Sequence, residues 1–284
     1  MLQTWVIFIV LYGILKGLRE PIKKNILKKV DLLTTLFVYT AVGFLLSAPT
    51  AEGVLDIPPN IFGWILVKCL AIFVAWIAAF VGLKKVPVSL YGITDMSRVI
   101  FSTLMGVIFL GESLTLKGIV SLILVVLGLY FANSKKGKNA EEYRAKYIWL
   151  IILSCALNAV SGTLDKYIMA SGEITSSALQ FWFMAITSIM YLVYMLIKKH
   201  KIDLKNALKN PWIYVLSISL IVGDRLLFIA NANPLSQVTV MTLIKQSAAI
   251  VTIVSGKVLY NEKNITKKLI CAGVILTGIV LAVI

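Results

Sequence analysis

The stretch SKKGKNAEEYRAK, residues 134–146, lies between two long apolar segments, residues 114–133 and 147–170. Each flanking segment has the composition of a membrane-spanning helix, which needs about 20 predominantly apolar residues. Four more such segments precede this pair and four follow it, so the basic stretch divides the chain into two halves. The ten predicted spans are 2–18, 31–50, 60–83, 87–110, 114–133, 147–170, 174–197, 211–231, 234–260 and 266–284.

The bulk composition agrees with an all-α polytopic membrane protein. Of the 284 residues, 59% are hydrophobic and 14% are charged, with a mean hydropathy of +0.91. Soluble domains average about 45–50% apolar and 25% charged residues. The first apolar segment is expected to stay as a helix and not to be a cleaved signal peptide. The three cysteines lie inside apolar segments, without the spacing of a metal site or a disulfide framework.

The net charge of +15 is a topology signal. The odd-numbered loops between the predicted spans hold 20 basic residues, and the even-numbered loops hold Lys117 alone. By the positive-inside rule, the odd loops lie in the cytoplasm and both termini are extracytoplasmic. The sequence thus predicts a multi-pass protein of the cytoplasmic membrane, with the lipid bilayer as its surroundings and no nucleic-acid partner.

The two halves resemble each other when one is shifted by 150 residues. This shift aligns Lys16 with Lys166, Ser97 with Ser247, Gly106 with Gly256, Glu112 with Glu262 and Gly128 with Gly278. Because five helices is an odd number, the halves would cross the membrane in opposite senses. Inverted repeats are characteristic of secondary transporters, with the binding site near the midplane. The predicted organisation is a first repeat at 1–133, a basic cytoplasmic linker at 134–146 and a second repeat at 147–284.

Phe109-Leu110-Gly111-Glu112 closes the fourth predicted helix, and Leu259-Tyr260-Asn261-Glu262 repeats the pattern more loosely in the second half. Ten helices with these motifs resemble the drug/metabolite transporter superfamily, EamA type. The resemblance implies a transporter whose fourth and ninth helices face a central cavity. Distant branches of that superfamily often carry a lysine in the ninth helix, in stretches similar to Thr242–Gln246.

Two predicted helices carry charges deep in the membrane. Tyr91, Asp95 and Arg98 share one face of the fourth helix, and Thr242 and Lys245 share one face of the ninth. A shift anchored on the prolines aligns Arg98 with Lys245, whereas the 150-residue shift aligns Asp95 with Lys245, and both alignments stay open. Asp95 and Arg98 either neutralise each other alone, or Arg98 also contacts a substrate oxygen.

Lys245 is the central candidate, because no acidic residue lies between Gln237 and Glu262 and an unpaired cation at that depth costs a few kcal/mol. We expect it to meet an acidic substrate group. The alternatives are that Lys245 pairs with Asp95 or is uncharged in an empty cavity, since burial disfavours a charged amine. The predicted substrate-binding residues are Lys245, Arg98, Asp95, Tyr91, Thr242, Gln246, Asp224 and Arg225. Asp165 and Lys166 are predicted to act in gating or coupling, and Lys68 to snorkel to the membrane surface.

These features predict a secondary transporter, an exporter or exchanger, for a small anionic or zwitterionic metabolite such as an amino acid, organic acid or phosphorylated compound. No cofactor, metal or catalytic residue is predicted, proton coupling stays open, and the chain is a monomer or homodimer. A cation or multidrug transporter is the main alternative. The first predicted helix lacks an acid, which argues against it, but Trp76, Tyr91, Trp182 and Tyr191 would suit an aromatic cage. An intramembrane enzyme is less favoured, because no catalytic motif occurs.

Overall fold

A computed structural model describes residues 4–111, 116–133, 138–262 and 264–283, and in these ranges the regular structure is entirely helical. The helices of the first half are α1 (Thr4–Ile26), α2 (Leu32–Ser47), the 3₁₀ turn η1 (Ala48–Thr50), α3 (Pro59–Lys85), α4 (Val88–Asp95), α5 (Arg98–Leu110) and α6 (Leu116–Asn133). Those of the second half are α7 (Lys138–Ala170), α8 (Ser176–Ile197), α9 (Leu204–Leu208), α10 (Pro211–Ala232), α11 (Val238–Lys245), α12 (Ser247–Tyr260) and α13 (Ile265–Val283). Helix α7 thus begins inside the predicted linker.

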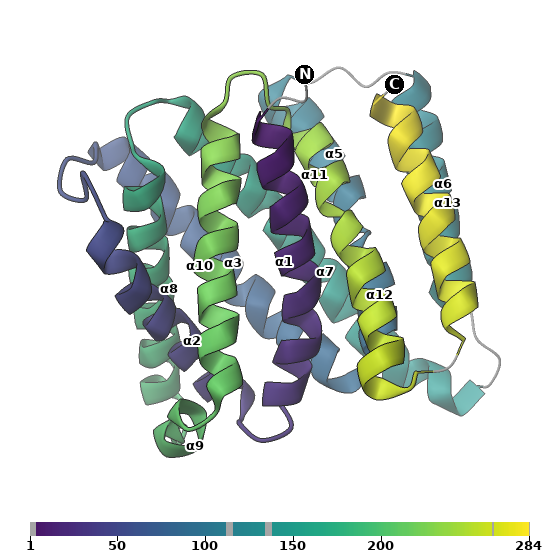
Figure 1. Ribbon diagram of the computed structural model, residues 1–284, viewed down its shortest axis with the longest axis horizontal. Coiled ribbons are helices and arrows are strands. Elements are labelled where there is room, and N and C mark those ends of the chain that lie inside the picture. Colours follow the sequence, from purple (N-terminus) through teal and green to yellow (C-terminus); the bar gives the residue numbers. More distant parts are fainter. Residues whose placement is uncertain (1–3, 112–115, 134–137, 263, 284) are drawn as a thin grey trace.

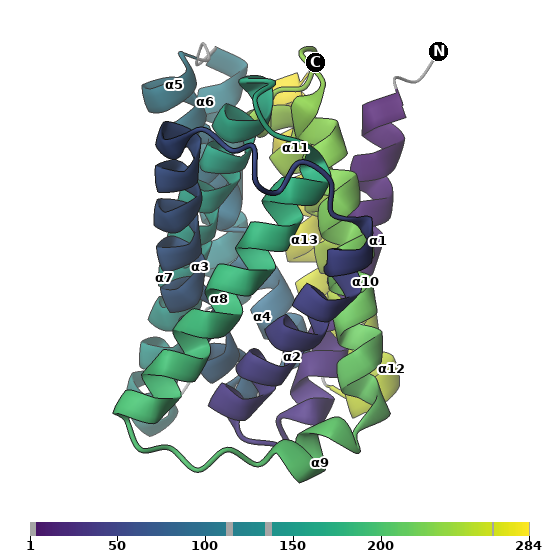
Figure 2. The same cartoon turned by 90° about the vertical axis from the view of Figure 1, so that its left-hand side faces the viewer.

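The helices stand side by side in a bundle (Figure 1). Helices α2 and α8 contact each other at one end of the bundle, and α6 and α13 contact each other at the other end. Between them, α1 contacts α10 and α12, while α7 contacts α3 and α5. Helix α1 begins and α13 ends at the same face, the upper one in Figure 1, and the short α9 lies at the opposite face (Figures 1 and 2).

Among the described residues, six helical segments are long and apolar enough to cross a membrane by length and composition. They are Leu32–Thr50, Pro59–Lys85, Val88–Phe109, Ala145–Ala170, Ser176–Ile197 and Pro211–Ala232. Leu116–Phe131 and Ala248–Tyr260 are shorter apolar helices. The bundle is therefore that of a membrane protein, as its composition predicts.

Two of the predicted helices are each interrupted near the middle. The segment predicted at 87–110 divides into α4, which ends at Asp95, and α5, which begins at Arg98. The segment predicted at 234–260 divides into α11, which ends at Lys245, and α12. At the first break the backbone tightens into 3₁₀-type bonds, including Met96 N–H to Ile93 O at 3.0 Å. Both interruptions therefore fall next to the predicted site residues.

Helix α1 is longer than the predicted span 2–18, since it continues through Pro21 to Ile26. A proline inside a helix removes the N–H that would bond to the carbonyl four residues earlier. Here that carbonyl belongs to Gly17. The Thr252 hydroxyl of α12 lies 3.2 Å from it and 2.9 Å from the Ala248 carbonyl, and shares its hydrogen between the two. Arg19 and Lys23, predicted to lie in a loop, are therefore part of α1 and face the interior of the bundle.

Glycines allow the closest helix contacts. A Cβ added to Gly82 of α3 would lie 2.5 Å from Ile151 Cγ1 of α7, and one on Gly128 of α6 would lie 2.4 Å from Ile275 Cγ1 of α13. Small residues let backbones approach each other in membranes, where apolar burial alone gives little driving force. These contacts bring α3 against α7 and α6 against α13.

Candidate functional site

An open cavity lies inside the bundle. Side chains of α1, α3, α7 and α10 form most of its wall, with contributions from α2, α4, α5, α8 and α11. The cationic side chains that line it are Lys16, Arg19, Lys23, Lys68, Arg98 and Lys245, and the acidic ones are Glu20, Asp165 and Asp224. Ionisable groups at this depth in a membrane protein are typical of substrate and ion pathways.

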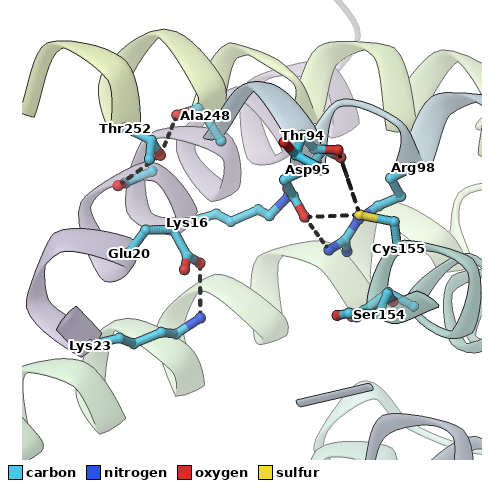
Figure 3. Close-up of polar contacts among 12 residues, drawn as sticks. Lys16, Glu20, Lys23, Thr94, Asp95, Arg98, Ser154, Cys155, Ala248 and Thr252 are labelled. Atoms are coloured by element: carbon cyan, nitrogen blue, oxygen red, sulfur yellow. Dashed lines mark hydrogen bonds and ion pairs between the residues drawn. The ribbon is translucent and has the colours of Figure 1, made fainter. Parts of the chain in front are cut away.

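Asp95 lies beside the cavity and joins two of these cations (Figure 3). Its Oδ2 is 2.5 Å from Lys16 Nζ, and its Oδ1 accepts a bond from Arg98 Nη2 at 2.9 Å. The Cys155 thiol of α7 lies 3.5 Å from the same Oδ1. The predicted pair of Asp95 and Arg98 is present, but Lys16 makes it a group of three charges. Only one negative charge therefore faces two positive ones.

Lys245 follows a different pattern. Its side chain is half-buried in the cavity wall, and its Nζ lies 5.9 Å from the centre of the Tyr12 ring. Within the described part of the chain, no hydrogen bond or ion pair includes Lys245. Asp95 is held by Lys16 and Arg98, so the alternative in which Asp95 pairs with Lys245 is wrong. The charges of Arg98 and Lys16 repel that of Lys245, and those of Asp165 and Asp224 attract it more weakly.

Asp224 and Arg225 face different ways, because neighbours on a helix point about 100° apart. Asp224 lines the cavity and pairs with Arg19 Nη1 at 3.6 Å. Arg225 lies outside the cavity lining, where it donates to Gln180 Oε1 at 2.8 Å and to Thr50 Oγ1 at 3.1 Å. In this conformation Arg225 therefore lies away from the cavity, and Asp224 is the member of the pair that reaches it.

Asp165 and Lys166 also point in different directions. Asp165 lines the cavity and lies 3.0 Å from Lys68 Nζ. Lys68 is only 2% exposed and sits 3.7 Å from the centre of the Phe183 ring, so the prediction that it snorkels is wrong. Lys166 donates to the carbonyls of Asn231 and Asn233 at 3.1 and 2.9 Å and thereby caps the end of α10.

The remaining predicted residues have separate surroundings. Tyr91 is 4% exposed and lines the cavity. Gln246 is buried at the break between α11 and α12 and is not part of the cavity lining. The side chain of Thr242 lies outside the described residues, as does Glu112 of the first motif. Tyr91 is thus the uncharged predicted residue that the structure brings to the cavity.

Arg19, Glu20 and Lys23 were missed because the predicted helix ended at residue 18, whereas Lys16 lay inside it but was not predicted to reach the site. Tyr12, Lys16, Arg19 and Lys23 are spaced by four, three and four residues, which places them on one face. This helical spacing continues across Pro21, so it could have predicted that the helix extends beyond residue 18. Glu20 also lies on α1 and bonds Lys23 at 2.8 Å, so the argument that the first helix lacks an acid is wrong.

Charged side chains around a cavity in a bundle of apolar helices are typical of a membrane transporter. Residues 3–134 match the model of the EamA-like transporter family. The EamA-like family is part of the drug/metabolite transporter superfamily, so the resemblance seen in the sequence is confirmed over these residues. Members of the family are transporters and not enzymes.

A solved crystal structure, titled only as that of a protein, is similar to this chain with a TM-score of 0.74. The match covers 99% of this chain and 97% of that one at 11% sequence identity, so it shows likeness of fold alone. No curated protein sequence matches the chain.

Proposed function

We propose that the chain is a secondary transporter that moves a small anionic or zwitterionic metabolite across the cytoplasmic membrane by alternating access, as an exporter or exchanger. The observation that carries this proposal is Lys245, a half-buried cation in the cavity wall without an acidic partner among the described residues. Since Asp95 already faces two cations, an entering carboxylate or phosphate replaces the missing negative charge. Exchange and proton coupling are both compatible with this site.

The proposed architecture is ten spans in two inverted repeats, residues 1–133 and 147–284. Helices α4 and α11 support it, because a shift of 150 residues carries the bounds Val88–Asp95 onto Val238–Lys245. The residues that end the following helices, Gly111 and Asn261, both adopt left-handed backbone conformations and differ by the same shift. This correspondence favours aligning Asp95 with Lys245, so the two breaks carry opposite charges.

The helix contacts also agree with the repeat. In the two halves α1 corresponds to α7, α3 to α10 and α5 to α12. The contact of α1 with α10 therefore corresponds to that of α7 with α3, and the contact of α1 with α12 to that of α7 with α5. All four contacts are present. The common face at which α1 begins and α13 ends fits extracytoplasmic termini (Figure 1).

A cage for a quaternary ammonium is less well supported. Trp76 and Tyr91 line the cavity, but Trp182 bonds the carbonyl of Val54 and Tyr191 is fully buried against Phe73. The four predicted aromatic residues therefore do not surround one space. A catalytic pair of Asp95 and Asp224 is disfavoured as well, because each is held in an ion pair with a cation.

Two measurements test the proposal. A thermal-shift screen of purified protein against amino acids, phosphorylated sugars, nucleotides and quaternary amines is expected to give stabilisation by anionic or zwitterionic compounds. Selective stabilisation by quaternary amines alone would overturn the anion site. Solute counterflow in liposomes is then expected with the stabilising compound, whereas conversion of that compound to a product would indicate an enzyme.

A further inference from the structure

The connection between α8 and α10 forms a short helix at the face opposite the start of α1 (Figure 2). Asp203 caps this helix, α9, by accepting from Asn206 N–H at 3.3 Å. Ala207 is fully buried, and α9 contacts α2 and α10. Leu204 and Leu208 are 43% and 46% exposed, so α9 turns two leucines away from the bundle. Apolar side chains displayed in this way on a short helix fit the membrane interface.

Beside α9 lies an open hollow lined by Lys29, Asn206, Lys209, Asn210, Pro211 and Trp212. Lys29 comes from the connection between α1 and α2. A bond of 2.8 Å between His200 Nε2 and Asp31 Oδ1 holds this connection against the one that carries α9. Lys29 and Lys209 are exposed, and neither has an ion pair within the described residues. The hollow is therefore a positively charged space between two tethered connections.

Trp212 lies at the first turn of α10 and is 46% exposed. Tryptophan is enriched where the acyl chains of lipids meet their headgroups, so Trp212 indicates that the hollow lies at the level of the headgroups. The exposed leucines of α9 lie on the neighbouring segment. A soluble anion would bind the lysines alone. A lipid would bind the lysines through its headgroup and also cover the exposed apolar side chains beside them. This combination favours a lipid over a soluble anion.

We propose that this hollow is a binding site for the headgroup of an anionic phospholipid in the adjacent leaflet. Lys29 and Lys209 bind the headgroup phosphate, the amide of Asn206 donates to it, and Trp212 and the α9 leucines contact the acyl chains. In the proposed orientation this face is cytoplasmic, where anionic lipids attract basic segments. The site lies outside the central cavity and is independent of the transported substrate.

The test uses the full chain in nanodiscs of phosphatidylcholine, with and without phosphatidylglycerol, and compares thermal stability with lipid retention in native mass spectra. Phosphatidylglycerol is expected to stabilise the wild type and to remain bound. In Lys29→Gln/Lys209→Gln its affinity falls roughly tenfold to thirtyfold, since each lysine contributes about 1 kcal/mol. The matched control is Lys198→Gln/Lys201→Gln, which removes two exposed lysines between α8 and α9 in the sequence that do not line the hollow.

Equal loss in both double variants, or no preference for phosphatidylglycerol, would overturn the site. A further arm adds inorganic phosphate to the phosphatidylcholine sample. Equal stabilisation by inorganic phosphate would contradict a lipid site, because the apolar contacts would then contribute nothing. All replaced lysines are exposed, so thermal unfolding without added anionic lipid is expected to be the same in all three proteins.

Discussion

Lys16 Nζ of α1 lies 2.5 Å from Asp95 Oδ2 at the end of α4. Asp95 is the only acidic residue of α4 and α5, and it thus pairs with a cation from another helix. Arg98 holds the other oxygen of Asp95 at 2.9 Å (Figure 3). Both cations depend on one acid. Lys245 faces the cavity without sharing this acid, and its Nζ lies 5.9 Å from the centre of the Tyr12 ring.

Asp95→Asn should destabilise the protein strongly. Removing one partner of a buried ion pair leaves an uncompensated charge and costs about 3–5 kcal/mol. Here two cations lose their acid. Asp224→Asn is the matched control, and it should cost less because Asp224 faces a single cation at 3.6 Å. Thermal unfolding in detergent measures both, and an equal or larger loss for Asp224→Asn would contradict this account of the Asp95 group.

Gly82→Ala should also destabilise the protein. The added Cβ would lie 2.5 Å from Ile151 Cγ1 and 3.2 Å from the Tyr147 carbonyl, so α3 and α7 must separate. Overpacking of this kind costs about 1–3 kcal/mol. Gly63→Ala on the same helix meets nothing within 4 Å and serves as the control. Equal unfolding temperatures for the two variants would show that α3 and α7 are not in close contact.

Glu262 makes part of the stability depend on pH. It lies between α12 and α13, and its carboxylate accepts bonds from the first N–H groups of α4, at 2.6 Å from Val88 and 3.1 Å from Ser89. Burial acts to raise the pKa of Glu262, but these bonds and Lys268 lower the pKa overall. The stabilisation is therefore complete above the ordinary pKa of a glutamate, about 4.3. It is lost as the pH falls through the lowered pKa of the folded state.

Glu262→Gln should lower stability at neutral pH by about 1–3 kcal/mol, since it removes a charged acceptor from the start of α4. The variant should also lose less stability than the wild type on acidification. Unfolding temperatures measured from pH 7 down to about pH 2, below the ordinary pKa of a glutamate, check both points. Glu173→Gln, an exposed position on the opposite face, is the control and should follow the wild-type profile.

Apolar length and loop charge were enough to predict an all-helical membrane protein, and a four-residue motif pointed to its family. Lys245 and Asp224 were also found, because each is a charge deep in an apolar run. Their partners could not be predicted. Lys16 and Lys166 align in the repeat, yet Lys16 pairs with Asp95 and Lys166 caps α10. Which polar group a long lysine reaches depends on the neighbouring helices.

The end of α1 shows a second limit. Pro21 and the adjacent charges indicate a helix end in sequence, since a proline leaves a carbonyl unpaired and buried charges are costly. In the folded chain Thr252 satisfies that carbonyl, and the cavity accommodates the charges. Thr252 is more than 200 positions away in the sequence, and the cavity is lined by helices from both halves of the chain, so local patterns contain neither.

The most direct test of the central claim is the affinity of the stabilising anion for Lys245→Met, measured by calorimetry on purified protein. Loss of one charged contact of about 2 kcal/mol weakens binding roughly thirtyfold. Lys257→Met, an exposed lysine on α12, is the matched control and should bind as the wild type does. Unchanged affinity in a folded Lys245→Met would contradict the claim that Lys245 meets the acidic group of the substrate.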